Sequence, residues 1–246
     1  MPLTVGSLFS GIGGIDLGLE RAGMKVLWQV EIDPWCRTVL AKHWPDVERF
    51  EDVRDVGAAN LRPVDLIAGG FPCQDISWAS PTGTGLDGSR SGLWAQFRRI
   101  IGELRPRYVL VENVAALARR GLSRVLADLA ALGFDAEWSD LSACSMGAPH
   151  TRRRLFVVAH ANSLDGRSRL WHSAARSRWQ VQAFDGFAGA RAGWETRMAN
   201  PSALYGNADG VPYRMDRNRG VGNAVVPQVI QEIGRRIVEA EQAVTK

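Results

Sequence analysis

The sequence contains few cysteines and no long apolar run. Its three cysteines, Cys36, Cys73 and Cys144, lie far apart and form no CxxC pair, so neither a disulfide framework nor a zinc site is indicated. No segment approaches the roughly 18 consecutive apolar residues of a membrane span. The first 14 residues also lack the basic start and cleavage site of a signal peptide. We therefore expect a cytoplasmic protein with reduced thiols, no metal and no membrane contact.

Lysine is also scarce, and only three of the 30 basic residues are lysines. The formal net charge is +4 and the pI is near 9.3, which fits a polyanionic partner, although many ordinary proteins are mildly basic. Arginine suits bidentate contacts with phosphate and guanine, but an arginine-rich coding bias would give the same composition. Charge alone therefore leaves a nucleic-acid partner open.

Short apolar runs alternate with amphipathic stretches over about the first 160 residues. With 246 residues, 46% of them hydrophobic, the chain can bury one α/β core and a small appended domain. The pattern predicts strands at 3–9, 25–32, 47–52, 64–70, 108–114, 136–143 and 153–161, and helices at 15–23, from Pro34, at 93–104, at 122–134 and from near Pro227. Strands separated by helices predict a doubly wound, mostly parallel sheet.

The character of the sequence changes after Ala161. Residues 161–216 are rich in glycine, arginine and tryptophan and have no clear periodicity. We interpret them as a small inserted region. Residues 1–160 and 217–246 would then form one domain, completed by the C-terminal helix.

A glycine turn, "FSGIGG" at 9–14, follows the first predicted strand. Glycines there let a ligand approach the backbone, although a tight structural turn would look the same. Glu31 and Asp52 end the next two strands, where they could accept hydrogen bonds from a ribose and an adenine amino group; either acid alone would more often be a solvated strand end. Full GxGxxG spacing and the GxxxxGK[ST] pattern are both missing, which favours S-adenosylmethionine over a dinucleotide or a triphosphate.

A cysteine stands where the fourth predicted strand ends, in "GGFPCQ". A lone cysteine is more often a small buried hydrophobe, but other residues with catalytic potential are expected near Cys73. Glu112 ends the fifth strand, and the arginines 152–154 open the last one. A thiolate, a carboxyl group that can be protonated and fixed arginines suit covalent attack on an electron-poor ring such as cytosine.

These motifs together resemble the DNA (cytosine-5) methyltransferase family, of its short phage or bacterial type. In family order they are "FSGIGG" (9–14), "EID" (31–33), "EDVRD" (51–55), "GGFPCQDIS" (69–77), "SRSGLW" (89–94), "ENV" (112–114), "GAPHTRRR" (147–154) and "GNAVVPQ" (222–228). The resemblance implies a Rossmann-like, S-adenosylmethionine-dependent methyltransferase fold. It also implies methyl transfer to carbon-5 of a cytosine flipped out of duplex DNA, through a covalent cysteine adduct, with S-adenosylhomocysteine as the product.

The resemblance assigns roles to individual residues. The catalytic residues would be Cys73, Glu112, Arg152 and Arg154. The cofactor would contact Phe9, Gly11, Ile12, Gly13, Gly14, Glu31, Ile32, Asp52, Val53, Gly70, Pro72, Leu93 and Asn223. Ser77 and Arg90, in the loop after the nucleophile, would contact DNA, and residues 161–216 would select the target sequence.

The resemblance leaves some alternatives open. His150 stands where the family usually has glutamine, and we read it as a hydrogen-bonding substitute rather than a metal ligand. A tRNA cytosine-5 methyltransferase would share the catalytic residues, and a catalytically inactive DNA-binding relative would share the fold. We expect a monomer that acts on double-stranded DNA, with a companion restriction endonuclease as an open question.

Overall fold

The computed structural model describes residues 1–72, 92–146, 152–161, 220 and 224–244. The strands are β1 (Thr4–Leu8), β2 (Lys25–Val30), β3 (Glu48–Phe50), β4 (Leu66–Gly69), β5 (Tyr108–Val114), β6 (Phe134–Ser142) and β7 (Arg153–Ala161). The helices are α1 (Gly14–Arg21), α2 (Pro34–His43), α3 (Leu93–Leu104), α4 (Leu117–Arg120), α5 (Leu122–Ala131) and α10 (Pro227–Val244), with a 3-10 turn, η2, at Ala143–Met146. Several sequence predictions lie outside the described residues: those for Cys73, Ser77, Arg90, His150, Asn223 and 162–216.

The seven strands of the described residues form one sheet, in the order β3-β2-β1-β4-β5-β7-β6. The pairs between β3 and β5 are parallel, whereas β7 runs antiparallel to both β5 and β6. The prediction of a mostly parallel sheet is therefore confirmed. The chain between β6 and β7 has no α-helix among its described residues, and an antiparallel pair, unlike a parallel one, needs no helical crossover.

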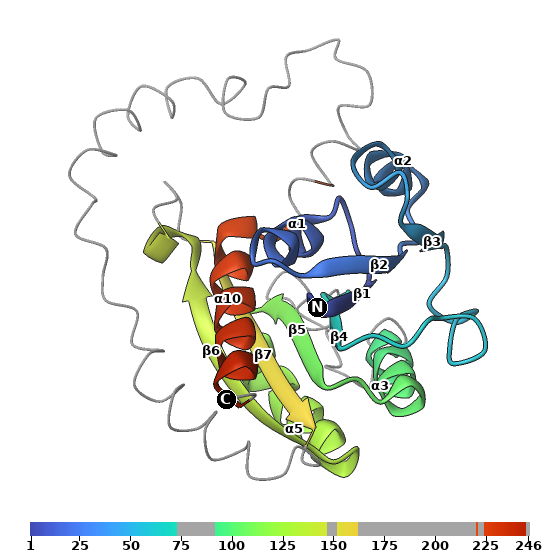
Figure 1. Ribbon diagram of the computed structural model, residues 1–246. Helices are drawn as coiled ribbons and strands as arrows, with labels where there is room; N and C mark the ends of the chain where they lie inside the picture. The colour runs from blue at the N-terminus through green and yellow to red at the C-terminus, as the bar shows by residue number, and fades with distance from the viewer. Residues whose placement is uncertain (73–91, 147–151, 162–219, 221–223, 245–246) are drawn as a thin grey trace, which may run out of the picture.

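Helices cover both faces of the sheet (Figure 1). On one face α3 and α5 bury Phe97, Ile101 and Leu129 against the sheet. On the other face α1 and α10 bury Leu19 and Ile233. Each face thus has its own apolar core, as a doubly wound sheet requires.

The C-terminal helix α10 packs beside α1, although some 200 residues separate them in sequence (Figure 1). Gly18 permits this approach, because a Cβ built there would lie 2.5 Å from the Cβ of Ile230. At its far end, Glu241 accepts hydrogen bonds from Arg107 and from the hydroxyl of Tyr108, the latter at 2.8 Å. The predicted helix near Pro227 is therefore confirmed, and it folds back onto the first half of the chain.

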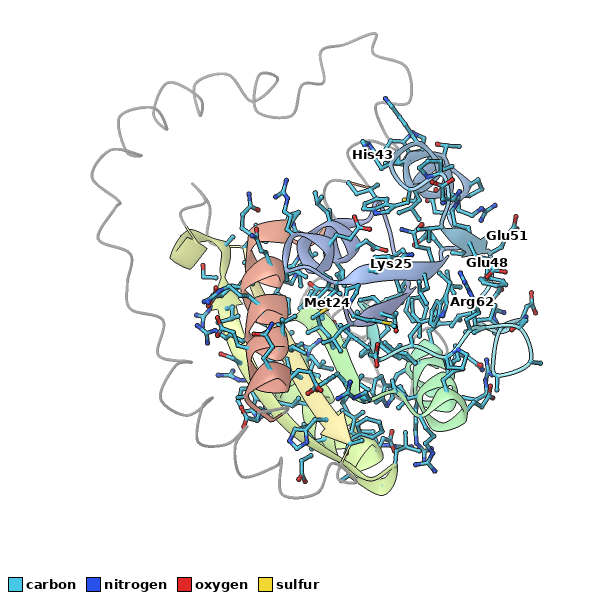
Figure 2. All side chains as sticks on the ribbon, in the orientation of Figure 1. Met24, Lys25, His43, Glu48, Glu51 and Arg62 are labelled. Atoms are coloured by element: carbon cyan, nitrogen blue, oxygen red, sulfur yellow. The ribbon has the colours of Figure 1, made fainter. Side chains whose placement is uncertain are left out.

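The edge strand β3 carries charged side chains (Figure 2). Glu48 lies 3.9 Å from Arg62, and Glu51, just beyond the strand, lies 3.1 Å from Arg37. Charged side chains protect an open sheet edge from pairing with other chains. None of the helices within the described ranges is long and apolar enough to span a membrane.

Element boundaries differ from the sequence prediction mainly at strand ends. Strands β2 and β3 are shorter than predicted, so Glu31 lies one residue beyond its strand and Asp52 two residues beyond. The short helix α4 was not predicted, since four residues are too few for a periodic pattern. The predicted bounds 93–104, 108–114 and 153–161 match α3, β5 and β7.

Candidate functional site

A pocket of about 510 Å³ opens at the carboxyl edge of the parallel strands. It lies beside β1 and β4, where the strand order reverses direction. Open α/β sheets bind ligands at such a switch point, and the volume falls in the usual range for small-molecule sites. The predicted site residues among its lining are Phe9, Gly11, Ile12, Gly14, Glu31, Ile32, Asp52, Val53, Gly70, Pro72, Leu93, Glu112 and Arg154.

Glu31 is held firmly on one side of the pocket. Its two carboxylate oxygens accept backbone N–H bonds from Gly11, at 2.7 Å, and from Asp33, at 2.8 Å. Each oxygen keeps further acceptor capacity. The Asp33 side chain in turn caps α2 by accepting from the backbone of Trp35 at 2.9 Å. The glycine turn, Glu31 and the start of α2 therefore form one hydrogen-bonded unit, with a fixed acceptor facing the pocket.

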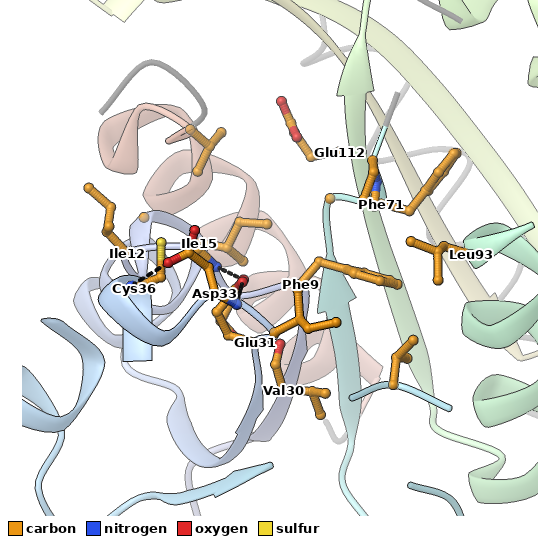
Figure 3. Close-up of a pocket in the computed structure, with 18 of the residues that line it drawn as sticks. Phe9, Ile12, Ile15, Val30, Glu31, Asp33, Cys36, Phe71, Leu93 and Glu112 are labelled. Carbon is orange, nitrogen blue, oxygen red and sulfur yellow. Dashed lines mark hydrogen bonds between the residues drawn. The ribbon is translucent and has the colours of Figure 1, made fainter. Parts of the chain in front are cut away.

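Phe9 lies in the middle of the pocket, between the half around Glu31 and the half at the ends of β4 and β5 (Figure 3). Figure 3 shows it between Glu31 on one side and Phe71 with Leu93 on the other. Its φ is 54°, in the left-handed region that non-glycine residues seldom adopt. Its ring lies 6.2 Å from that of Phe97 on α3. Such backbone strain persists only where the surroundings enforce it, and it is concentrated at functional sites.

Asp52 lies in a turn after β3. Its Oδ1 accepts from the backbone N–H of Arg54, at 2.9 Å, and from the Arg54 guanidinium, at 3.1 Å. Among the described residues, no donor reaches Oδ2. Asp52 therefore has a held carboxylate with one oxygen available to a ligand in the pocket.

The other half of the pocket is formed by the ends of β4 and β5. These strands pair in parallel with Gly69 beside Val111, so the chain just past β4 runs next to Glu112. Gly70 lies close to this side chain, since a Cβ built there would be 2.6 Å from a Glu112 carboxylate oxygen. The Asn113 side chain donates to the carbonyl of Phe71 at 3.0 Å. Asn113 on β5 thus holds the backbone at Phe71, two residues before position 73.

Arg154 lies near the start of β7, which runs antiparallel to β5, and its side chain contacts Glu112. Its Nε lies 3.0 Å from a Glu112 carboxylate oxygen. Burial raises the pKa of Glu112, while the charges of Arg154 and Arg152 and the hydrogen bond from Arg154 act against that rise. The site therefore presents a carboxyl group that can hold a proton more readily than an exposed glutamate, beside a fixed cation.

Two of the predicted site residues in the described part of the chain do not line the pocket. The ring of Trp44 would lie 2.3 Å from a Cβ on Gly13, so Gly13 packs against the α2 side instead. Arg152 borders a smaller neighbouring cavity with Leu141 and Val229. There burial, followed by the like charge of Arg154, lowers the pKa of Arg152.

Several pocket residues were missed from the sequence. Ser10, Asp33, Phe71, Asn113 and Val225 line the pocket without having been predicted. All five lie inside or next to the quoted motifs, so the motifs were the available signal. Across the described ranges, no group of three or more His, Cys, Asp or Glu side chains could hold a metal ion.

A family model described as C-5 cytosine-specific DNA methylase matches residues 3–197. The chain belongs to this family. The match covers more than half of the chain and begins just before β1. The predicted family and its methyltransferase fold are therefore confirmed.

Individual members of the family are similar over about two thirds of the chain. The Type II methyltransferase M2.BsuMI of Bacillus subtilis is 37% identical over 165 residues, which cover 64% of this chain and 42% of the relative. The Type II methyltransferase M.Eco47II of Escherichia coli is 35% identical over 181 residues, covering 70% and 43%. The matches thus span less than half the length of these relatives.

Solved structures share the fold. A prophage-encoded Escherichia coli protein described as a DNA modification methyltransferase superposes with a TM-score of 0.56 at 32% identity, covering 66% of this chain and 47% of the other. A DNMT2 mutant from Spodoptera frugiperda gives a TM-score of 0.66 at 14% identity, covering 96% and 99%. At that low identity, the second comparison supports the fold alone.

Proposed function

We propose that the protein methylates carbon-5 of cytosine in double-stranded DNA, with S-adenosylmethionine as the methyl donor. The observation that carries this proposal is the ion pair of Glu112 and Arg154, whose side chains lie 3.0 Å apart. The pair lies beside Gly70, and Gly70 precedes Cys73 by three residues in the sequence. A carboxyl group that can hold a proton, a neighbouring cation and a cysteine are together suited to attack on a cytosine ring. Membership of the C-5 cytosine-specific DNA methylase family supports the same reaction.

The pocket fits the proposed cofactor. Glu31 would accept hydrogen bonds from the ribose hydroxyls, and the free oxygen of Asp52 would accept one from the adenine amino group. Phe9, Ile32, Val53 and Leu93 would supply apolar walls for the adenosyl group; Ile32 is 60% exposed and has apolar surface to bury. The bound cofactor would supply an electrophilic methyl group on sulfur and leave as S-adenosylhomocysteine.

The chain's own residues would carry out the covalent steps. The Cys73 thiolate attacks carbon-6 of a flipped cytosine, and a new C–S bond replaces the carbon-5 to carbon-6 double bond. Glu112 donates a proton to ring nitrogen 3, which accepts the electron pair. Carbon-5 then takes the methyl group, a base removes the carbon-5 proton, and the returning double bond expels the thiolate. Ring nitrogen 3 gives its proton back to Glu112, which restores the acid.

Glu112 and Arg154 divide the work at the ring. Burial favours the protonated form of Glu112, which a proton donor needs. Arg154 keeps the carboxyl in one orientation, and its charge stabilises the carboxylate left after proton transfer. Arg152, held nearby, would assist the orientation of the base.

The remaining parts would serve DNA binding. Ser77 and Arg90 would contact the DNA near the flipped base, and residues 161–216 would read the target sequence. Such a small region can place only a few side chains in the major groove, so we expect a target of about four base pairs or fewer. We expect a monomer; a companion endonuclease would follow the Type II naming of the relatives.

Transfer of labelled methyl groups from S-adenosylmethionine tests the proposal. The purified chain should label duplex DNA and not tRNA, and bisulfite sequencing should locate the label at cytosines. Labelling of tRNA alone would support the rival tRNA methyltransferase. Binding of duplex DNA without any transfer would support the inactive DNA-binding relative.

A further inference from the structure

Arg99 on α3 contacts the loop that follows β3. Its Nη2 donates to two backbone carbonyls of that loop, Val53 at 3.0 Å and Val56 at 2.8 Å. Its Nε donates to Gln96 at 2.8 Å, and its Nη1 to Glu103 at 2.8 Å. Because Gln96 and Glu103 belong to the same helix, they fix the guanidinium group in the orientation that reaches the loop.

The loop at 51–57 lies outside the strands and depends on side chains for its position. Val53 and Val56 are 5% and 3% exposed, so their backbone lies at the edge of the core. Carbonyl groups there need a hydrogen-bond donor, since an unpaired one costs about as much as a lost bond. Arg99 supplies the donor for both.

Glu103 completes the attachment. Its Oε2 accepts from the backbone N–H of Ala58 at 3.0 Å, while Oε1 accepts from Arg99. A Cβ on Gly57 would lie 2.2 Å from the Glu103 carboxylate, so the helix and the loop are in close contact. One arginine and one glutamate therefore attach the chain to α3 at Val53, Val56 and Ala58.

The loop carries pocket residues at its start. Asp52 and Val53 both line the pocket, and the carbonyl of Val53 is one that Arg99 holds. Arg99 itself is absent from the pocket lining. Its hydrogen bonds to the loop therefore link it to the pocket without direct contact with a ligand.

We propose that Arg99 is a positioning residue for the adenine end of the cofactor. By holding the carbonyls of Val53 and Val56, it sets Asp52 where that carboxylate can accept the adenine amino group. The inference rests on the proposed function, because it takes the pocket to bind an adenosyl group. It adds a residue outside the pocket that governs which purine the pocket prefers.

Calorimetry with two ligands tests the proposal. S-adenosylhomocysteine carries the amino group, whereas S-inosylhomocysteine has a carbonyl in its place. Wild type should prefer the first by about tenfold or more, since hydrogen bonds to charged groups are the stronger kind. Arg99→Met should lose most of this preference, and Arg99→Lys, which keeps the charge but not the planar guanidinium group, should retain part of it.

Arg235→Met is the matched control. Arg235 lies on a different helix, α10, and pairs with Glu232 and Glu239 in the same helical spacing, so its loss removes comparable ion pairs away from the pocket. That variant should keep the wild-type preference. If Arg99→Met does not fold by circular dichroism, Arg99→Lys carries the test.

The outcomes separate the two proposals. If wild type binds S-adenosylhomocysteine but both Arg99 variants weaken the two ligands equally, the preference is unchanged and the positioning role is wrong. If wild type binds neither ligand, the proposed cofactor is wrong and the inference is overturned with it. A reduced preference in the Arg99 variants alone supports the inference.

Discussion

Arg154 Nε lies 3.0 Å from a carboxylate oxygen of Glu112, across the antiparallel pair of β5 and β7. Arg154 stands opposite Val114 in the register, two residues along from Glu112, so both side chains share one face of the sheet. This contact depends on the direction of β7, which begins at the edge of the sheet where β5 ends. In a parallel strand, Arg154 would begin at the opposite edge, far from the pocket.

Glu112→Gln should slow the chemical step without affecting cofactor binding. Glutamine keeps the size of the side chain but cannot transfer a proton, and general acid catalysis typically contributes about 100-fold or more. Single-turnover methylation should show that loss, while calorimetry with S-adenosylhomocysteine should give an affinity within about twofold of wild type. A variant that binds the cofactor poorly but reacts at the normal rate would contradict the role.

The pH dependence of the same step should report Glu112. Burial raises the pKa of this acid, so its protonated form extends to higher pH than for an exposed glutamate. If the proton is needed, the rate must fall as pH rises through the Glu112 pKa. Single-turnover rates should show this decline in wild type, and Glu112→Gln should lack it. A decline that persists unchanged in the variant would assign it to another group.

Glu31→Ala should weaken S-adenosylhomocysteine binding by roughly 1.5 to 3 kcal/mol, the usual loss for hydrogen bonds to a charged group. The carboxylate is also needed locally, since it accepts the N–H groups of Gly11 and Asp33. Glu48→Ala is the matched control, because Glu48 lies on the exposed edge strand. Undiminished affinity in Glu31→Ala, measured by calorimetry, would remove Glu31 from the proposed pocket.

Asp16→Asn should change how stability depends on pH. Asp16 is fully buried and accepts from Ser7 at 3.1 Å and Gln29 at 2.9 Å. Burial raises its pKa from 3.8 to about 6. The folded state therefore binds a proton more tightly than the unfolded state does, and stability falls as pH rises from about 3.8 to about 6, by about 3 kcal/mol in total.

The asparagine variant lacks this loss. Urea unfolding should therefore show Asp16→Asn gaining stability relative to wild type between pH 4 and pH 7, while exposed Asp46→Asn gains none. An equal difference at both pH values would show that folding does not raise the pKa of Asp16.

The sequence predicted the elements whose patterns are strong. Helix α3 and strand β5 match their predicted bounds because apolar periodicity is clear in both. Glu112 and the residues before Cys73 were expected at one edge, since the carboxyl ends of parallel strands meet there. Most predicted cofactor residues share the pocket for the same reason.

Other features depend on packing that a linear pattern does not contain. The direction of β7 could not be predicted from the sequence, because the apolar pattern of a strand is the same in either orientation. Gly13 packs under Trp44, a residue 31 positions away, and so leaves the pocket lining. The two carbonyl partners of Arg99 lie 46 and 43 positions away in the sequence, so a helical pattern does not indicate them.

A covalent complex with DNA tests the central claim most directly. Duplex DNA carrying 5-fluorocytosine at the target should become trapped on the protein when S-adenosylmethionine is present, because fluorine at carbon-5 blocks the final elimination. The complex should survive denaturing electrophoresis for wild type and for Cys144→Ala, and it should be absent for Cys73→Ala. A trapped complex in Cys73→Ala, or none in an otherwise methylating wild type, would contradict the proposed mechanism.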